Sequence, residues 1–251
     1  CADGLRACLG RRAPTPKNKI ALAGGVEAAI TDASAPILNA VETETLFDVL
    51  DIPRSPSQLI KGPGEASKIG YPVAAKIVSG DIAHKTEAGG IVLNIADDAA
   101  LDDASARILA SARESFPDAE ISGILLQPME SGLAEALVGY RDNPETGPIV
   151  MVGVGGLLAE IYADVAIRLA PVDKAAAREM INEVKGMAPI RGYRGLPEGD
   201  CAALADAIVR LSTLALVPGG PVMEAEINPV IVRRAGEGVV AVDGLVALKE
   251  A

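Results

Sequence analysis

The spacing of apolar residues along the chain predicts both helices and strands. Apolar residues three or four positions apart predict helices at residues 35–50, 101–116, 173–185 and 200–216, with a shorter helix at residues 62–70. Short apolar runs that end at Gly, Pro, Asn or Asp predict strands at residues 71–78, 91–95, 121–129, 135–140, 149–154, 224–232 and 239–242.

The order of these elements predicts two lobes. Two strands, a helix and a strand come first, and two strands, two helices and two strands follow. This order favours two α+β lobes that face each other, with the boundary near residues 127–131. Residues 1–30 are rich in Pro and basic residues, and we expect them to form a tail.

Composition is consistent with a sheet covered by helices, because 49% of the residues are hydrophobic and only 2% are aromatic. No apolar run reaches the roughly 18–20 residues of a transmembrane helix, and the first residues lack the apolar stretch of a signal peptide. The cysteines are too few and scattered for a disulfide framework or a zinc site. We therefore expect a cytoplasmic protein without membrane association.

The formal net charge of −11 argues against nucleic acid as a general partner, because binding to a phosphate backbone needs a basic surface. This net charge does not exclude the binding of a single nucleotide, because a nucleotide site needs only local positive charge.

The densest polar segment lies between the first two predicted strands. Lys76 ends an apolar run, so its ammonium group can reach a phosphate while its stem stays packed. The loop that follows contains Ser79, Thr86, Gly89 and Gly90, whose backbone N–H groups can bind anionic oxygens. An ordinary polar hairpin remains the alternative, since the segment has neither a P-loop nor a dinucleotide-binding glycine pattern.

His84 is the chain's single histidine and lies in the same loop, between Asp81 and Lys85. An imidazole at this position would place a titratable nucleophile in a loop that can bind phosphate. A structural or exposed histidine is the alternative.

Two further segments combine glycine with charge. Gly153, Gly155 and Gly156 end a predicted strand and allow close backbone approach, although a tight turn explains them equally well. Residues 192–195 form a second glycine-containing segment that could meet an anion or be a solvated turn.

Carboxylate and amide side chains gather near the end of the chain. Glu226 and Asn228 are two positions apart on a predicted strand, so their side chains share one face. Asp243, on the next strand, can join them, and such oxygen ligands suit Mg²⁺ shared with nucleotide phosphates. A polar strand end with surface carboxylates is the alternative.

Taken together, these motifs resemble one family. They occur in the order expected for the ATP-grasp region of acyl-CoA synthetases of the NDP-forming type, which are relatives of succinyl-CoA synthetase and include the ADP-forming acetate–CoA ligases. The resemblance covers roughly residues 35–246 and rests on residues 71–79, 82–86, 89–90, 147–153, 155–156, 168–171, 192–195 and 226–229.

The resemblance implies an ATP-grasp fold, in which two α/β lobes enclose a nucleotide cleft. Residues 1–34 would be a tail or linker from a preceding domain, residues 35–126 the N-terminal lobe and residues 127–251 the C-terminal lobe. Lys76 would face Asn228 across the cleft.

The resemblance also implies roles for individual residues. Those that would bind the nucleotide are Lys76, Gly89 and Gly90 near the phosphates, and Gln127, Pro128 and Met129 at a hinge that recognises adenine, with Glu135 nearby. Those that would hold Mg²⁺ are Glu226, Asn228 and Asp243. His84 matches a histidine that passes a phosphoryl group in the family.

The reaction implied is the reversible conversion of acyl-CoA, ADP and phosphate into acid, CoA and ATP. It needs CoA-binding and ligase domains, which we expect in the same polypeptide or in a partner subunit, and which would receive acyl-CoA and phosphate. Two alternatives stay open at this point: a non-catalytic regulatory module fused to a protein acetyltransferase, and an ATP-grasp carboxylate–amine ligase.

Overall fold

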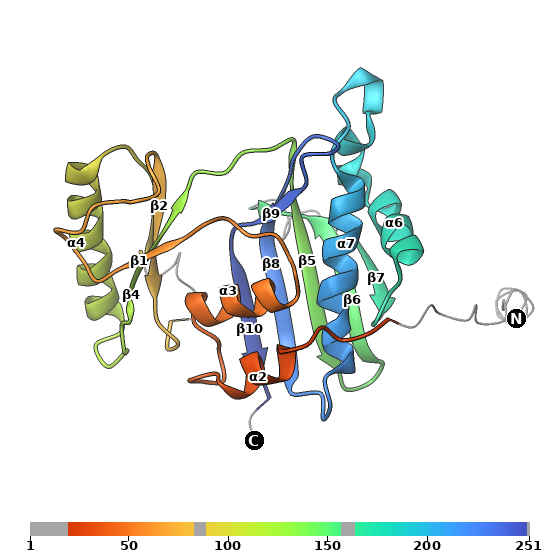
Figure 1. Ribbon diagram of the computed structural model, residues 1–251, viewed down its shortest axis with the longest axis horizontal. Helices are drawn as coiled ribbons and strands as arrows, with labels where there is room; N and C mark the ends of the chain where they lie inside the picture. The colour runs from red at the N-terminus through yellow and green to blue at the C-terminus, as the bar shows by residue number, and fades with distance from the viewer. Residues whose placement is uncertain (1–19, 83–88, 157–163, 250–251) are drawn as a thin grey trace, which may run out of the picture.

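The computed structural model describes residues 20–82, 89–156 and 164–249. These residues form two antiparallel sheets, each with its own helices (Figure 1). The smaller sheet has the strand order β1-β4-β2-β3, and the larger has the order β10-β8-β5-β6-β7, with β9 paired to β8.

The smaller lobe packs one helix on one face of its sheet. Its elements are β1 (Gln58–Ile60), β2 (Val73–Val78), β3 (Ile91–Ile95), α4 (Asp98–Ser115) and β4 (Gly123–Pro128). Asp97 caps the start of helix α4, because its side chain accepts a hydrogen bond from Ala100 N at 2.8 Å. Leu101 and Ile108 on this helix are fully buried in one core with Ile77 of β2.

The larger lobe covers one face of its sheet with several helices. Its strands are β5 (Ala134–Asn143), β6 (Gly147–Val154), β7 (Val165–Leu169), β8 (Val222–Val232), β9 (Val239–Ala241) and β10 (Gly244–Leu248). Its helices are α2 (Val26–Thr31), α3 (Ala40–Val49), α6 (Lys174–Glu183) and α7 (Cys201–Ser212), with 3-10 turns at η2 (Lys185–Met187), η3 (Pro189–Arg191), η4 (Tyr193–Gly195) and η5 (Thr213–Leu216).

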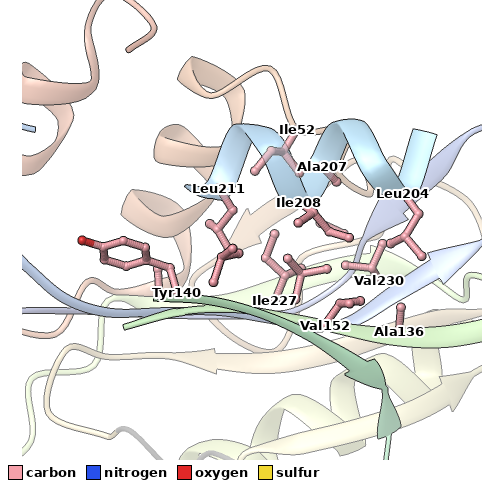
Figure 2. Packing of buried hydrophobic residues seen from close by; sticks show 14 of the residues in the cluster. Ile52, Ala136, Tyr140, Val152, Leu204, Ala207, Ile208, Leu211, Ile227 and Val230 are labelled. Atoms are coloured by element: carbon pink, nitrogen blue, oxygen red, sulfur yellow. The ribbon is translucent and has the colours of Figure 1, made fainter. Parts of the chain in front are cut away.

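Helix α7 lies along the centre of the larger core. Leu204, Ile208 and Leu211 follow helical spacing and are fully buried. Their side chains point toward the sheet, where Val152 and Ile227 meet them (Figure 2). Burial of each such side chain stabilises the folded state by about 1.5–3 kcal/mol. The packing of α7 on the sheet therefore holds in place the strands that carry the site.

The N-terminal segment differs from the expected lobe bounds. Val26 and Ile30 of α2 are buried in the larger core, so the predicted tail or linker is wrong for this part of residues 1–34. Leu46 and Phe47 of α3 lie in the same core, although residues 35–126 were expected to form the other lobe. Periodicity locates the apolar face of a helix but does not identify the sheet that covers it, which explains the error.

Several element bounds also differ. The predicted helix at residues 62–70 is wrong, since the segment forms turns in which Gly64 and Gly70 have φ of 90° and 82°. Helix α3 begins only at Ala40, because Asn39 and Glu42 form a capping box there. Strands β1, β7 and β10 were not predicted; each lies at the edge of its sheet and has only three to five residues.

The chain crosses from the smaller sheet to the larger between Pro128 and Ala134. Across the three described segments, no helix is both long and apolar enough to cross a membrane.

Candidate functional site

Lys76 carries a positive charge into the junction between the lobes. Along β2, Ala75 and Ile77 enter the core beneath α4, so Lys76 points to the opposite side, toward the larger lobe. Its Nζ donates a hydrogen bond to Val242 O at 3.0 Å and lies 3.9 Å from Asp243 Oδ2. Only 4% of Lys76 is exposed, and a buried ammonium group needs such partners to offset its desolvation.

Asn228 and Asp243 meet the lysine from the larger lobe. Asn228 N donates to Asp243 O at 3.1 Å, which holds the two residues side by side on neighbouring segments. Lys76 and Asn228, which were expected to face each other, are linked through Asp243. Lys76 contacts Val242 and Asp243, and Asn228 is hydrogen-bonded directly to Asp243.

The polar side chains here have defined local partners. Asn228 Oδ1 accepts a hydrogen bond from Gly156 N at 2.9 Å, and Asp243 Oδ1 accepts one from Gly244 N at 2.9 Å. Glu226 lies two positions before Asn228 on β8, opposite Leu245 of β10. Two positions along a strand place Glu226 and Asn228 on the same face of the sheet.

This donor set fits Mg²⁺. Among residues 20–82, 89–156 and 164–249, no three His, Cys, Asp or Glu side chains form a group that could hold a metal alone. Mg²⁺ commonly uses only one or two carboxylates, together with substrate phosphates and water. Asp243 supplies a hard oxygen atom near the ammonium group of Lys76, and Asn228 and Glu226 supply further oxygen atoms from β8.

Glu135 lies close to Asn228, one of the residues expected to hold Mg²⁺. Its backbone oxygen accepts a hydrogen bond from Gly155 N at 2.8 Å, and a side chain at Gly156 would collide with its carboxylate. Because Gly156 N also bonds Asn228, the structure groups Glu135 with Asn228, whereas the sequence associated it with the hinge.

The expected hinge residues occupy the end of β4 and its continuation. Gln127 pairs with Ala74 across the sheet and is 2% exposed. Met129 N donates to Pro72 O at 3.2 Å, so the chain leaves the smaller sheet only after this residue.

Sequence reasoning missed a polar cluster beside the hinge. Gln127 Nε2 donates to Glu44 Oε1 at 3.0 Å, and Arg54 Nη1 lies 3.2 Å from Glu44 Oε2. A bidentate hydrogen bond to Asp48 raises the pKa of Arg54 above its ordinary value. Glu44 and Gln127 lie 83 positions apart, so no local pattern could indicate this contact.

A second ionic contact lies on the crossover between β4 and β5. Glu130 accepts hydrogen bonds from Ser55 Oγ at 2.8 Å and from Arg233 Nη2 at 2.6 Å. It therefore joins the segment after α3, the crossover and the end of β8.

The loop predicted to bind phosphate is described only in part. His84 lies outside the described residues. Gly90 O accepts a hydrogen bond from Ile77 N at 2.8 Å, and a Cβ on Gly89 would lie 2.6 Å from Ser111 Oγ of α4. Close approach to α4 is thus one structural reason for glycine at position 89.

Arg168 and Arg194, which belong to two of the segments that carry the resemblance, have other partners. Arg168 forms an ion pair with Glu183 of α6, and Arg194 stacks on Tyr193 at 5.2 Å from the ring centre.

Comparison with known proteins identifies the family. The sequence pattern of the ATP-grasp domain matches residues 29–248. The β subunit of ADP-forming acetate–CoA ligase II from Pyrococcus furiosus is 36% identical over 212 residues, which cover 83% of this chain and 90% of the relative. ADP-forming acetate–CoA ligase I from Archaeoglobus fulgidus is 41% identical over 175 residues, but these cover 70% of this chain and only 25% of that protein.

A solved structure agrees with this assignment. The dinucleotide-forming acetyl-coenzyme A synthetase 1 of Ca. Korarchaeum cryptofilum, in complex with coenzyme A, Ca-AMPCP and HgCl⁺, is 32% identical with a TM-score of 0.77, over 85% of this chain and 93% of that one. Another crystal structure of that enzyme holds coenzyme A and Mg-AMPPCP, with its phosphohistidine segment pointing towards the nucleotide binding site.

The predicted fold, two lobes of the ATP-grasp type, is confirmed by the matched domain and by this structural similarity. The chain belongs to the ATP-grasp family, in the group that includes the β subunits of ADP-forming acetate–CoA ligases.

Proposed function

We propose that this chain binds Mg²⁺·ADP or Mg²⁺·ATP between its lobes and transfers a phosphoryl group within an ADP-forming acyl-CoA ligase. The observation that carries the proposal is the junction itself. The buried ammonium group of Lys76, from one lobe, contacts Val242 and Asp243 of the other lobe, and Asn228 N donates a hydrogen bond to Asp243 O. A cation beside oxygen ligands suits the phosphates of a metal-bound nucleotide.

Lys76 would neutralise charge on the phosphate oxygens, and a preformed cation lowers the cost of charge that develops during transfer. Glu226, Asn228 and Asp243 would hold Mg²⁺, which supplies further neutralisation when bound. The backbone N–H groups of Gly89 and Gly90 would add hydrogen bonds to phosphate.

The base would lie against the hinge formed by Gln127, Pro128 and Met129, whose backbone groups recognise its polar edge. Glu135 completes the proposed nucleotide-binding set, on the side of Asn228.

His84 would be the nucleophile of this chain. A neutral imidazole nitrogen attacks the terminal phosphorus of ATP, the bond to the leaving oxygen breaks, and ADP departs. The phosphoryl group then passes to the acid, whose acyl phosphate reacts with CoA to release phosphate. Every step is reversible, so the same residues serve ATP synthesis.

The remaining chemistry requires partner domains. The chain spans a quarter of the Archaeoglobus relative but 90% of the Pyrococcus β subunit, which supports CoA-binding and ligase domains in the same polypeptide or in a partner subunit. Acyl-CoA and phosphate would reach the site through those domains.

Calorimetry tests the nucleotide site. Lys76→Ala should weaken Mg²⁺·ADP binding about ten- to hundredfold, because a charge-assisted hydrogen bond contributes about 1.5–3 kcal/mol. Asn228→Ala should weaken binding only when Mg²⁺ is present. Lys174→Ala, which removes a surface lysine paired with Asp206, is the matched control and should leave affinity unchanged. Equal affinities for the wild type and Lys76→Ala would contradict the proposal.

A further inference from the structure

The two charges at the junction between the lobes differ in how much solvent can reach them. Lys76 Nζ lies 3.9 Å from Asp243 Oδ2, and the lysine side chain is only 6% exposed whereas the aspartate side chain is 29% exposed. Asp243 directly precedes β10, the edge strand of the larger sheet that lies nearest to the smaller lobe (Figure 1). A ligand that approaches from solvent therefore meets the carboxylate before the ammonium group.

Each of the two groups has its own backbone partner. Lys76 Nζ donates to Val242 O at 3.0 Å, and Asp243 Oδ1 accepts from Gly244 N at 2.9 Å. The distance of 3.9 Å between Nζ and Oδ2 is too long for a hydrogen bond, so the attraction between them is Coulombic. Because no directional bond between them has to break, either group can take another partner of opposite charge.

The space between this pair and helix α3 is small. Lys76 and Asp243 line a pocket with Thr43, Glu44 and Gln127, and its cavity volume is about 20 Å³. That volume suits one water molecule and is too small for a phosphate group. Phosphate can therefore reach Lys76 only from the side on which the Asp243 carboxylate is exposed.

We infer that Asp243 screens Lys76 from free nucleotide, so that the site selects the Mg²⁺ complex of ADP or ATP. The inference rests on the proposed function, in which Lys76 binds phosphate and Asp243 holds the metal. A phosphate without metal would gain the ammonium group but lie beside the carboxylate, and like charges at this distance repel. Once Asp243 holds Mg²⁺, its charge is neutralised and the ammonium group is available to phosphate.

The same pair disfavours the metal alone. An Mg²⁺ ion at Asp243 would lie close to the ammonium group of Lys76, and phosphate oxygens are needed to neutralise both cations. Metal and nucleotide should therefore strengthen each other's binding, and by linkage the factor is the same for both.

Calorimetry with metal-free ADP tests the screening. ADP in EDTA is compared with Mg²⁺·ADP for the wild type and for Asp243→Asn, which removes the charge and keeps the shape. The variant should bind metal-free ADP at least about fivefold more tightly than the wild type, the smallest effect expected for unit charges about 4 Å apart in water. It should bind Mg²⁺·ADP more weakly, because a ligand of the metal is lost. A residue that only coordinates metal would leave the affinity for metal-free ADP unchanged.

Glu224→Gln is the matched control. Glu224 lies on β8 opposite Arg141, and its substitution removes the same charge from the strand that carries Asn228. The affinity for metal-free ADP should stay within about twofold of the wild type, because solvent and salt screen more distant charges. An equal gain in Glu224→Gln and Asp243→Asn would overturn the inference, since the gain would then follow the net charge of the lobe.

A second variant decides if Asp243→Asn does not fold. Mn²⁺ without nucleotide is titrated into the wild type and Lys76→Gln, and bound metal is measured from the loss of the free-ion electron paramagnetic resonance signal. Lys76→Gln keeps a donor for Val242 O but removes the positive charge, so it should bind Mn²⁺ at least about fivefold more tightly. Lys174→Gln, at a surface ion pair with Asp206, should leave the affinity unchanged. Equal Mn²⁺ affinities for the wild type and Lys76→Gln would overturn the inference.

The outcomes separate the screening by Asp243 from the proposed function. If the wild type binds Mg²⁺·ADP and Lys76→Ala weakens that binding, but Asp243→Asn gains no affinity for metal-free ADP, the screening is overturned and the function stands. If the wild type binds neither Mg²⁺·ADP nor metal-free ADP, the proposed function fails, and the screening fails with it.

Discussion

At single residues, close packing at the site depends on glycine. Gly155 N bonds Glu135 O, and a Cβ on Gly155 would lie 2.7 Å from the carbonyl carbon and oxygen of Ala136. Real Cβ atoms do not approach backbone so closely, and backbone cannot rotate away as a side chain can. The end of β6 can therefore reach β5, and bring Gly156 to Asn228, only without a side chain at position 155.

We expect Gly155→Ala to lower the free energy of unfolding by about 1–3 kcal/mol, the usual cost of forcing extra atoms into a packed region. Urea denaturation of purified protein measures this change. Gly24→Ala is the control, because a Cβ there would meet no atom within 4 Å, and its effect should stay within about 0.5 kcal/mol. Equal midpoints for the two variants would show that β6 can shift away from β5.

At the scale of elements, Asp200 joins helix α7 to the end of β8. Asp200 Oδ1 accepts a hydrogen bond from Ala203 N at 2.9 Å and so caps the helix. Its other oxygen accepts from Gly236 N and Gly238 N, both at 3.0 Å, in the turn before β9. Burial opposes ionisation of this carboxyl, but the backbone hydrogen bonds outweigh burial and lower its pKa below the ordinary 3.8.

This lowered pKa gives stability a pH dependence with a definite sign. A carboxyl whose pKa is lower in the folded state stabilises the fold fully above its unfolded pKa, and the stabilisation is lost as pH falls through the folded pKa. Asp200→Asn should therefore cost about 1–3 kcal/mol at pH 7, since an amide nitrogen cannot accept from the two glycines. The difference from wild type should shrink below about pH 4.

Urea denaturation from pH 7 to pH 3 checks this prediction. Asp173→Asn is the comparison, because Asp173 caps α6 with the single hydrogen bond from Ala176 N, and it should cost less at pH 7. A loss in Asp200→Asn that is constant over the whole range would contradict the assignment.

At the scale of the molecule, the two lobes have separate hydrophobic cores. One core lies between α4 and the smaller sheet, and the other lies between the helices and the larger sheet. A small cluster of Ala40, Val78 and Leu125 connects them beside Lys76. A nucleotide bound at the junction would contact both lobes, so its binding energy should stabilise both cores together.

We expect Mg²⁺·ADP at one hundred times its Kd to stabilise the protein by about 2.7 kcal/mol. For a chain of this size the increase in Tm should be about 5–10 °C. Differential scanning calorimetry measures the shift, and Lys76→Ala at the same nucleotide concentration should remove most of it. A nucleotide that binds by titration yet leaves Tm unchanged would place its site away from the junction.

Local sequence patterns predicted much of the fold. The helices at α4, α6 and α7 and the strands β2, β3, β5, β6 and β8 follow from apolar spacing, because each buries one face and the spacing repeats with its geometry. Lys76, Asn228 and Asp243 were candidates from the sequence, and the structure brings these three together. Their roles, and that of His84, stay predictions.

Tertiary structure alone decided the rest. The sheet on which α3 packs, the grouping of Glu135 with Asn228, and the contact between Glu44 and Gln127 all join residues far apart along the chain. Helical and strand periodicity report only which side of an element is apolar. The partner on that side is chosen when the whole core closes, so the contact between Glu44 and Gln127 could be recognised only in the folded molecule.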